Sequence, residues 1–153
     1  MKSFFIKVSK AVLALFGVTV FTACPFGAMY ATPYSDYEIK GKVVDETTDI
    51  PVQDLRVIIS GAYLSRGEMV VGSYGKDTVF TDNNGEFYVE GRDYHSDMYK
   101  HLHIEDIDST KNGLYENKEE FVELTQQKKP KPKGWYQGRF AADVTVKVTP
   151  KNE

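Results

Sequence analysis

Residues 78–90 read Thr-Val-Phe-Thr-Asp-Asn-Asn-Gly-Glu-Phe-Tyr-Val-Glu, two apolar runs on either side of a short polar segment. The polar segment, residues 82–85, ends in Asn-Gly, a pair that tolerates the positive φ angles of tight turns. The flanking residues are mostly β-branched or aromatic, and such side chains favour strands. The segment therefore predicts two strands joined as a β-hairpin.

Further strands with one buried face follow on both sides of this segment. Apolar and polar residues alternate with a period of two, which places every second side chain on the same face of a strand. Residues 69–71 add a short strand in a glycine-containing stretch. The residues expected to face inward are Tyr37, Ile39, Gly41 and Val43, then Leu55, Val57 and Ile59, then Leu102 and Ile104, then Val122 and Leu124, and finally Ala142, Val144, Val146 and Val148.

This pattern gives about seven strands and no helix. Short strands at regular spacing, separated by turn residues, are typical of an antiparallel sandwich. We therefore predict an all-β chain: a single antiparallel, Greek-key-like β-sandwich over residues 37–149, followed by a tail at 150–153.

The N-terminus has the layout of a bacterial lipoprotein signal peptide. Three lysines precede the apolar run at 11–21, which is too short to span a bilayer as a helix. Small residues at 22 and 23 then precede Cys24, the only cysteine of the chain. We expect cleavage after residue 23 and lipidation of Cys24, which removes the thiol and excludes disulfides from the mature chain.

The lipid on Cys24 is expected to hold the protein in the bacterial cell envelope, on the inner or outer membrane. Acyl chains contribute about 0.8 kcal/mol per buried methylene, so two or three chains anchor stably. Residues 24–36 contain prolines and glycine and are predicted to form a tether. No acidic residue precedes Asp36, and this favours the periplasmic side over the cell surface.

The charge balance argues against a nucleic-acid partner. The chain has 22 acidic and 19 basic side chains, and three of those lysines belong to the signal peptide. Loss of residues 1–23 therefore makes the net charge more negative, whereas nucleic-acid binders normally carry a basic surface.

Residues 41–91 resemble the carboxypeptidase regulatory-like, or transthyretin-like, β-sandwich. The resemblance rests on Gly-Lys-Val-Val-Asp at 41–45, Ile-Pro-Val at 50–52, Leu-Arg-Val at 55–57 and Thr-Asp-Asn-Asn-Gly-Glu-Phe at 81–87. Ile50 stands where that family usually has a glycine. The resemblance implies a fold and no chemistry.

The chain as a whole is similar to the radical SAM-associated lipoproteins of Bacteroidetes. The matching segments are Cys24, Ala-Thr-Pro-Tyr at 31–34, Asp-Ile-Asp at 106–108, Gly-Trp-Tyr at 134–136 and Asp-Val-Thr-Val at 143–146. Ser109 replaces the glycine that usually follows Asp-Ile-Asp. This resemblance implies a neighbouring radical SAM enzyme as a partner, and it carries no catalytic residue.

Residues 108–119 have the oxygen-bearing spacing of a calcium loop. Calcium needs six to eight oxygen ligands, and a glycine at the sixth position permits the sharp turn, as Gly113 does here. A polar loop with Asn-Gly as its turn explains the same residues, and the flanks read as strands rather than helices. The metal candidates are Asp108, Thr110, Asn112, Glu116 and Glu119.

A second metal candidate is the pair His101 and His103, which lie two residues apart and so share one strand face. His95 is near in sequence, but no third ligand follows from spacing. Because Leu102 and Ile104 occupy the inner face, the alternative is that both histidines point to solvent.

Two further surfaces are candidates for binding. The basic loop at 128–133 can contact anionic lipid, or it is a solvated, proline-stiffened loop. Trp135 and Tyr136 form either a binding surface or a cap on the core.

No Ser-His-Asp set, paired-acid motif or phosphate loop is recognisable. We therefore expect no enzyme and no cofactor, and a membrane-tethered interaction domain whose ligand the sequence does not name. The alternatives are a carbohydrate- or peptide-binding module and a calcium-stabilised structural domain.

Overall fold

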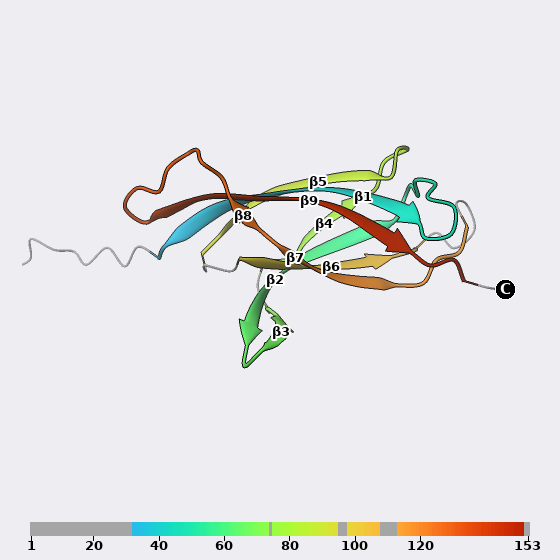
Figure 1. The fold of residues 1–153 in the computed structure, drawn as a ribbon, viewed down its shortest axis with the longest axis horizontal. Helices are drawn as coiled ribbons and strands as arrows, with labels where there is room; N and C mark the ends of the chain where they lie inside the picture. Colours follow the sequence, from blue (N-terminus) through green and yellow to red (C-terminus); the bar gives the residue numbers. More distant parts are fainter. Residues whose placement is uncertain (1–31, 74, 95–97, 108–112, 152–153) are drawn as a thin grey trace, which may run out of the picture. The chain divides into compact units, whose positions relative to one another are not determined.

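The computed structural model describes residues 32–73, 75–94, 98–107 and 113–151, and these form two β-sheets with no helix. The predicted all-β sandwich is confirmed, with nine strands in place of about seven (Figure 1). The strands are β1 (Tyr34–Asp45), β2 (Arg56–Ser65), β3 (Glu68–Val71), β4 (Asp77–Phe80), β5 (Glu86–Asp93), β6 (Tyr99–Glu105), β7 (Lys118–Glu123), β8 (Thr125–Gln126) and β9 (Tyr136–Val148).

The first sheet, here called the β1 sheet, has the order β5-β1-β9-β8. β1 pairs with β5 antiparallel, but it pairs with β9 in parallel over the long register from Asp36↔Arg139 to Asp45↔Val148. The prediction of a wholly antiparallel sandwich was wrong at this pair. Parallel neighbours need a long connection, and here almost the whole domain lies between the two strands.

The second sheet, here called the β2 sheet, has the order β3-β2-β6-β7. β4 also pairs with β2, beyond the end of the β2–β3 pairing. All of these pairs are antiparallel. The chain passes from this sheet to the β1 sheet at Leu124, which separates β7 from β8.

The turn at 82–85 forms, but the predicted hairpin does not. The Gly85 amide donates to the Asp82 carbonyl at 2.8 Å, and Gly85 has a φ of 70°. However, β4 before the turn pairs in the β2 sheet and β5 after it pairs in the β1 sheet. The Thr81 amide donates to the Leu55 carbonyl at 3.0 Å, and this bond keeps the incoming chain in the β2 sheet. The turn therefore joins the two layers.

The core lies between the two sheets and contains the side chains that the alternation predicted. Ile39, Val57, Leu102 and Val148 are each 0% exposed. Gly41 allows close packing in β1, because a Cβ at this position would lie 1.9 Å from the ring of Phe87. The cluster contains Tyr37, Ile39, Val43, Val52, Leu55, Val57, Ile59, Phe87, Val89, Leu102, Ile104, Tyr115, Val122, Leu124, Val146 and Val148.

Both ends of the domain extend past their predicted limits. β1 begins at Tyr34, so the last part of the predicted tether is strand. In the predicted tail, the Lys151 amide donates to the Leu114 carbonyl at 2.7 Å. Cys24 and the signal peptide lie outside the described residues. A search of the described residues finds no helix able to cross a membrane.

Candidate functional site

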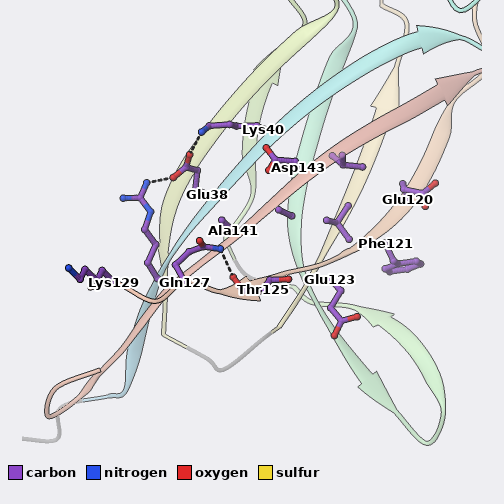
Figure 2. Close-up of a pocket in the computed structure, with 14 residues that line it drawn as sticks. Glu38, Lys40, Glu120, Phe121, Glu123, Thr125, Gln127, Lys129, Ala141 and Asp143 are labelled. Carbon is purple, nitrogen blue, oxygen red and sulfur yellow. Dashed lines mark hydrogen bonds and ion pairs between the residues drawn. The ribbon is translucent and has the colours of Figure 1, made fainter. Parts of the chain in front are cut away.

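A groove of about 780 Å³ follows the side of the domain where β7 and β9 lie next to each other (Figure 2). It exists because each of these strands ends its sheet along this stretch, so the two sheet edges face the same opening. At Leu124 the chain crosses between the two sheets, and the Leu124 amide donates to the Met98 carbonyl at 2.7 Å. The lining residues are Glu38, Lys40, Glu120, Phe121, Val122, Glu123, Thr125, Gln127, Lys129, Arg139, Ala141, Ala142, Asp143 and Val144.

One wall of the groove carries a small network of charges from β1 and β9. Lys40 Nζ lies 2.9 Å from Glu38 Oε1, and the Arg139 guanidinium also donates to Glu38. The hydrogen bond from Lys40 lowers the pKa of Glu38 most, and the hydrogen bond from Arg139 lowers it further. This carboxylate therefore stays ionised at neutral pH. Because the rest of the lining adds both acids and lysine, the groove suits a mixed polar surface better than a polyanion.

The main chain of β9 gives the groove its most specific feature. The Val148 carbonyl accepts from the Glu46 amide on the β1 side, while the Arg139 carbonyl accepts from the Gln127 amide on the opposite side. Amide and carbonyl of one residue point the same way and alternate along a strand. The main-chain amides and carbonyls of the even-numbered residues in this stretch therefore point to β1. Those of the odd-numbered residues point to the opposite, outer edge of β9.

β8 covers only the first part of that groove-facing edge, at Phe140 and Ala141. At the far end, the Thr149 carbonyl accepts from the Glu116 amide at 2.9 Å. Between these two points, no described strand pairs with the outer edge of β9. The amides and carbonyls of Asp143, Thr145 and Lys147 therefore form an open row of donors and acceptors, which starts at the groove with Asp143.

The histidine pair is not arranged as the sequence indicated. His101 is only 6% exposed, because the Phe121 ring on β7 lies 5.0 Å away and covers it. The expectation that both histidines face solvent was therefore wrong for His101. Its Nε2 has no hydrogen-bond partner among the described residues and lies 3.7 Å from Glu119 Oε2, while His103 Nδ1 lies 3.4 Å from Glu119 Oε1.

The structure thus brings Glu119 to the two histidines, a neighbour that sequence spacing did not identify. Across the described ranges, however, no group of three such side chains is arranged to hold a metal ion. Asp108, Thr110, Asn112 and His95 lie outside those ranges. Glu116 is exposed, and its amide bonds to Thr149, so of the five calcium candidates only Glu116 and Glu119 are described.

The aromatic pair separates into an exposed and a packed residue. Trp135 is 54% exposed, whereas the Tyr136 ring packs against Tyr34 with centroids 5.3 Å apart. The Trp135 carbonyl accepts from the Tyr34 amide at 2.9 Å, which ties this corner to the start of β1. The basic loop at 128–133 is exposed throughout, and Lys129 lines the groove.

A buried lysine was missed by the sequence analysis. Lys100 is 1% exposed, and its Nζ lies 2.5 Å from Asp93 Oδ2 and 3.9 Å from the centroid of the Tyr37 ring. Burial, and then a hydrogen bond to Asp77, raise the pKa of Tyr37. The signal that could have found it is the alternation itself, which places Lys100 on the inner face with Leu102 and Ile104.

Comparison with known proteins shows the fold alone. No protein-family model matches the chain, and no curated protein matches it. Among solved structures, a 3-chlorocatechol 1,2-dioxygenase from Rhodococcus opacus is 14% identical, with a TM-score of 0.50 over 79% of this chain and 66% of that one. The backbone protein of pilus 2b from group B streptococcus is 14% identical, with a TM-score of 0.45 over 74% of this chain and 40% of that one.

A shaft pilin, SpaA from Lactobacillus rhamnosus, is 10% identical, with a TM-score of 0.43 over 77% of this chain and 48% of that one. The chain therefore spans less than two thirds of each of these proteins. At such identities the likeness extends to a β-sandwich and to nothing chemical. It adds no support for the resemblance to the radical SAM-associated lipoproteins.

Proposed function

We propose that this chain is a membrane-anchored, non-catalytic interaction module that binds an extended polypeptide segment in the groove between β7 and β9. The observation that carries the proposal is the open row of main-chain donors and acceptors at Asp143, Thr145 and Lys147, which starts at the groove with Asp143 and continues along β9. An extended peptide that adds a strand to a sheet edge uses such a row for affinity and neighbouring pockets for specificity.

The groove supplies what a bound strand needs beyond its main chain. Ala142 and Val144 offer apolar contact on β9, and Phe121 on β7 is 38% exposed at the rim. The charges of Glu38, Lys40 and Arg139 then select among side chains of the incoming segment. Lipidation at Cys24 keeps the module at the envelope membrane, where its partner must also be found.

The partner is tested by photocrosslinking in membranes of the native host. A benzoylphenylalanine placed at Phe121 is expected to form a covalent adduct with a second polypeptide on irradiation. The same probe at Tyr88 is the control, because Tyr88 is 49% exposed on β5, which is the edge strand of the β1 sheet on the side away from β9. Equal yields at the two positions, or no adduct at Phe121, would contradict the proposal.

The resemblance to radical SAM-associated lipoproteins makes the neighbouring radical SAM enzyme one candidate for this partner. Deletion of that enzyme would then remove the Phe121 adduct and leave the amount of the lipoprotein in the membrane unchanged. An adduct that persists in the deletion strain would exclude the enzyme as the partner, and the proposed role as an interaction module would stand.

A carbohydrate-binding role is the second candidate, and the exposure of Trp135 favours it. An indole face that is 54% exposed can stack on a sugar ring. Trp135→Ala would then abolish retention on a polysaccharide column without changing the Phe121 adduct, so the two roles are separable.

A further inference from the structure

We propose that the polypeptide that occupies the open edge of β9 is the β9 strand of a second copy of this chain, paired antiparallel about Thr145. The inference rests on the proposed function above, because it uses the same edge, and it names the partner. Two copies that meet at equivalent edges form an isologous, two-fold interface.

The main-chain geometry fits this register. The two-fold axis places Thr145 opposite Thr145 of the second copy, and Asp143 opposite Lys147. All three residues direct their amides and carbonyls to the open edge. Each opposed pair can therefore exchange both of its hydrogen bonds, as hydrogen-bonded pairs in an antiparallel ladder do. No main-chain group of these residues needs to leave β1 for the pairing to form.

The side chains of the edge are complementary to themselves. Asp143 and Lys147 are both exposed and lie two residues on either side of Thr145 on the same face. In the proposed register each copy places its aspartate opposite the lysine of the other, and opposite charges across a strand pair are stabilising. The sequence of this edge is thus suited to pair with its own copy.

The other edge on the groove is not suited in this way. The Leu124 amide bonds to the β6 side. By alternation, the main-chain amides and carbonyls of Glu119, Phe121 and Glu123 in β7 therefore point to the outer edge, away from β6. Self-pairing of β7 about Phe121 would place Glu119 opposite Glu123, and like charges directly opposite are destabilising. This contrast assigns the self-pairing to β9.

Lys147 has a partner within its own chain, which the dimer must accommodate. Its Nζ lies 2.7 Å from Asp49 Oδ1, with the two side chains 52% and 72% exposed. Exposed ion pairs of this kind contribute little. Lys147 can therefore turn to Asp143 of the second copy without a large loss to the fold.

The test is disulfide trapping of the full-length chain in host membranes. Thr145→Cys is expected to give a disulfide-linked dimer, because hydrogen-bonded pairs have Cα atoms about 5.5 Å apart, within disulfide range. The wild-type chain, which carries only Cys24, and Tyr88→Cys at the opposite edge are the controls. Dimer yields that are equal in Thr145→Cys and Tyr88→Cys would overturn the proposal, since they would report collision alone.

Exchanging the charges of Asp143 and Lys147 in the Thr145→Cys variant distinguishes specific strand pairing from mere proximity of two copies. Asp143→Lys places two lysines opposite each other and is expected to reduce the dimer yield several-fold. Asp143→Lys combined with Lys147→Asp restores the opposed charges and is expected to restore the yield. A double variant no better than the single one would overturn this register.

The outcomes separate the two proposals. A Phe121 adduct with the mass of two copies, together with a Thr145→Cys dimer, supports the self-pairing. An adduct with a different polypeptide and no Thr145→Cys dimer overturns the self-pairing while the interaction module stands. Absence of both the adduct and the dimer overturns both.

Discussion

β1 and β9 are long neighbouring strands of one sheet, and they differ in how their edges are used. β1 lies between β5 and β9, so both of its edges carry ladders along most of its length. β9 has β1 on one side, but β8 covers only two of its positions on the other. The residues of β1 are fixed by pairing and packing, whereas no described strand pairs with the outer edge of the second half of β9.

The difference separates the part of the domain that stabilises the fold from the part where the proposed binding takes place. A row of unpaired main-chain groups promotes association, and proteins usually protect such edges. Here charged residues and a threonine mark the open edge, while apolar side chains of β9 turn to the core. Substitutions near β1 should therefore affect folding, and substitutions at the β9 edge should affect binding.

The largest expected effect comes from the buried charge beneath β1. Asp93→Asn leaves Lys100 in the core without its carboxylate, and breaking a buried pair in this way costs about 3–5 kcal/mol. We expect that loss in the free energy of unfolding, measured by urea denaturation followed by circular dichroism. Lys100→Met is the comparison variant and should lose less, because Asp93 retains 18% side-chain exposure. Equal losses for the two variants would contradict this account.

The next effect distinguishes the two edges of β9 directly. Val144→Pro removes an amide that bonds to β1 and leaves a β1 carbonyl unpaired, which costs about 1–3 kcal/mol. Thr145→Pro removes an amide that faces the open edge, where proline is tolerated. We expect the first variant to lower the urea midpoint clearly and the second to leave it nearly unchanged.

Thr145→Pro should nevertheless reduce the Phe121 photocrosslink, since the incoming strand loses a donor. If the midpoint falls as much for Thr145→Pro as for Val144→Pro, the assignment of the open edge is wrong. A stable Thr145→Pro variant with an undiminished crosslink would show that binding does not use this edge.

A smaller effect is expected at alkaline pH, from Tyr37 of β1. Burial and the Asp77 hydrogen bond raise the pKa of Tyr37 above its ordinary value near 10. The folded state therefore holds the phenolic proton more tightly than the unfolded state. The resulting stabilisation is complete below about pH 10 and is lost as the pH rises above that value. Tyr37→Phe should show a shallower loss of stability between pH 9 and pH 11, and an unchanged slope would contradict the assignment.

The smallest effect is expected from calcium. Glu116 and Glu119 are engaged or exposed without forming a metal-ready group with other described residues. A ligand that binds only the folded state must stabilise it. We expect the melting temperature to be the same in excess calcium and in chelator. A higher melting temperature in calcium than in chelator would support a metal site at residues 108–119, which would include Glu119 of β7.

Periodicity predicted which side chains lie inside, and it did so because a strand sends alternate residues to opposite faces. Leu102, Ile104, Val146 and Val148 are buried as expected. The same periodicity contains no information on which strands are neighbours. The parallel β1–β9 pair and the division of β4 and β5 between two sheets depend on contacts between residues far apart in sequence.

The candidate site was harder to predict from the sequence, because the hydrogen-bonding groups that define it belong to the main chain. The alternation places Asp143, Thr145 and Lys147 on the outer face of the last strand and says nothing about the partners of their main-chain groups. Which of their main-chain groups lack a partner depends on where β8 ends. Similarly, the burial of His101 depends on Phe121 across a strand pair, and sequence spacing along one strand does not reveal a neighbour on another.

The parallel pairing of β1 and β9 also has a mechanical consequence. With the proposed lipid on Cys24 as the anchor, a load applied through the N-terminus would reach β1 at Tyr34 and be directed along this strand. Because β1 is held on both sides by long ladders, that load shears many hydrogen bonds at once and does not open them one after another. β1 is thus the strand best placed to resist extraction, and the proposed anchored module would hold its proposed partner under tension without unravelling from the N-terminal end.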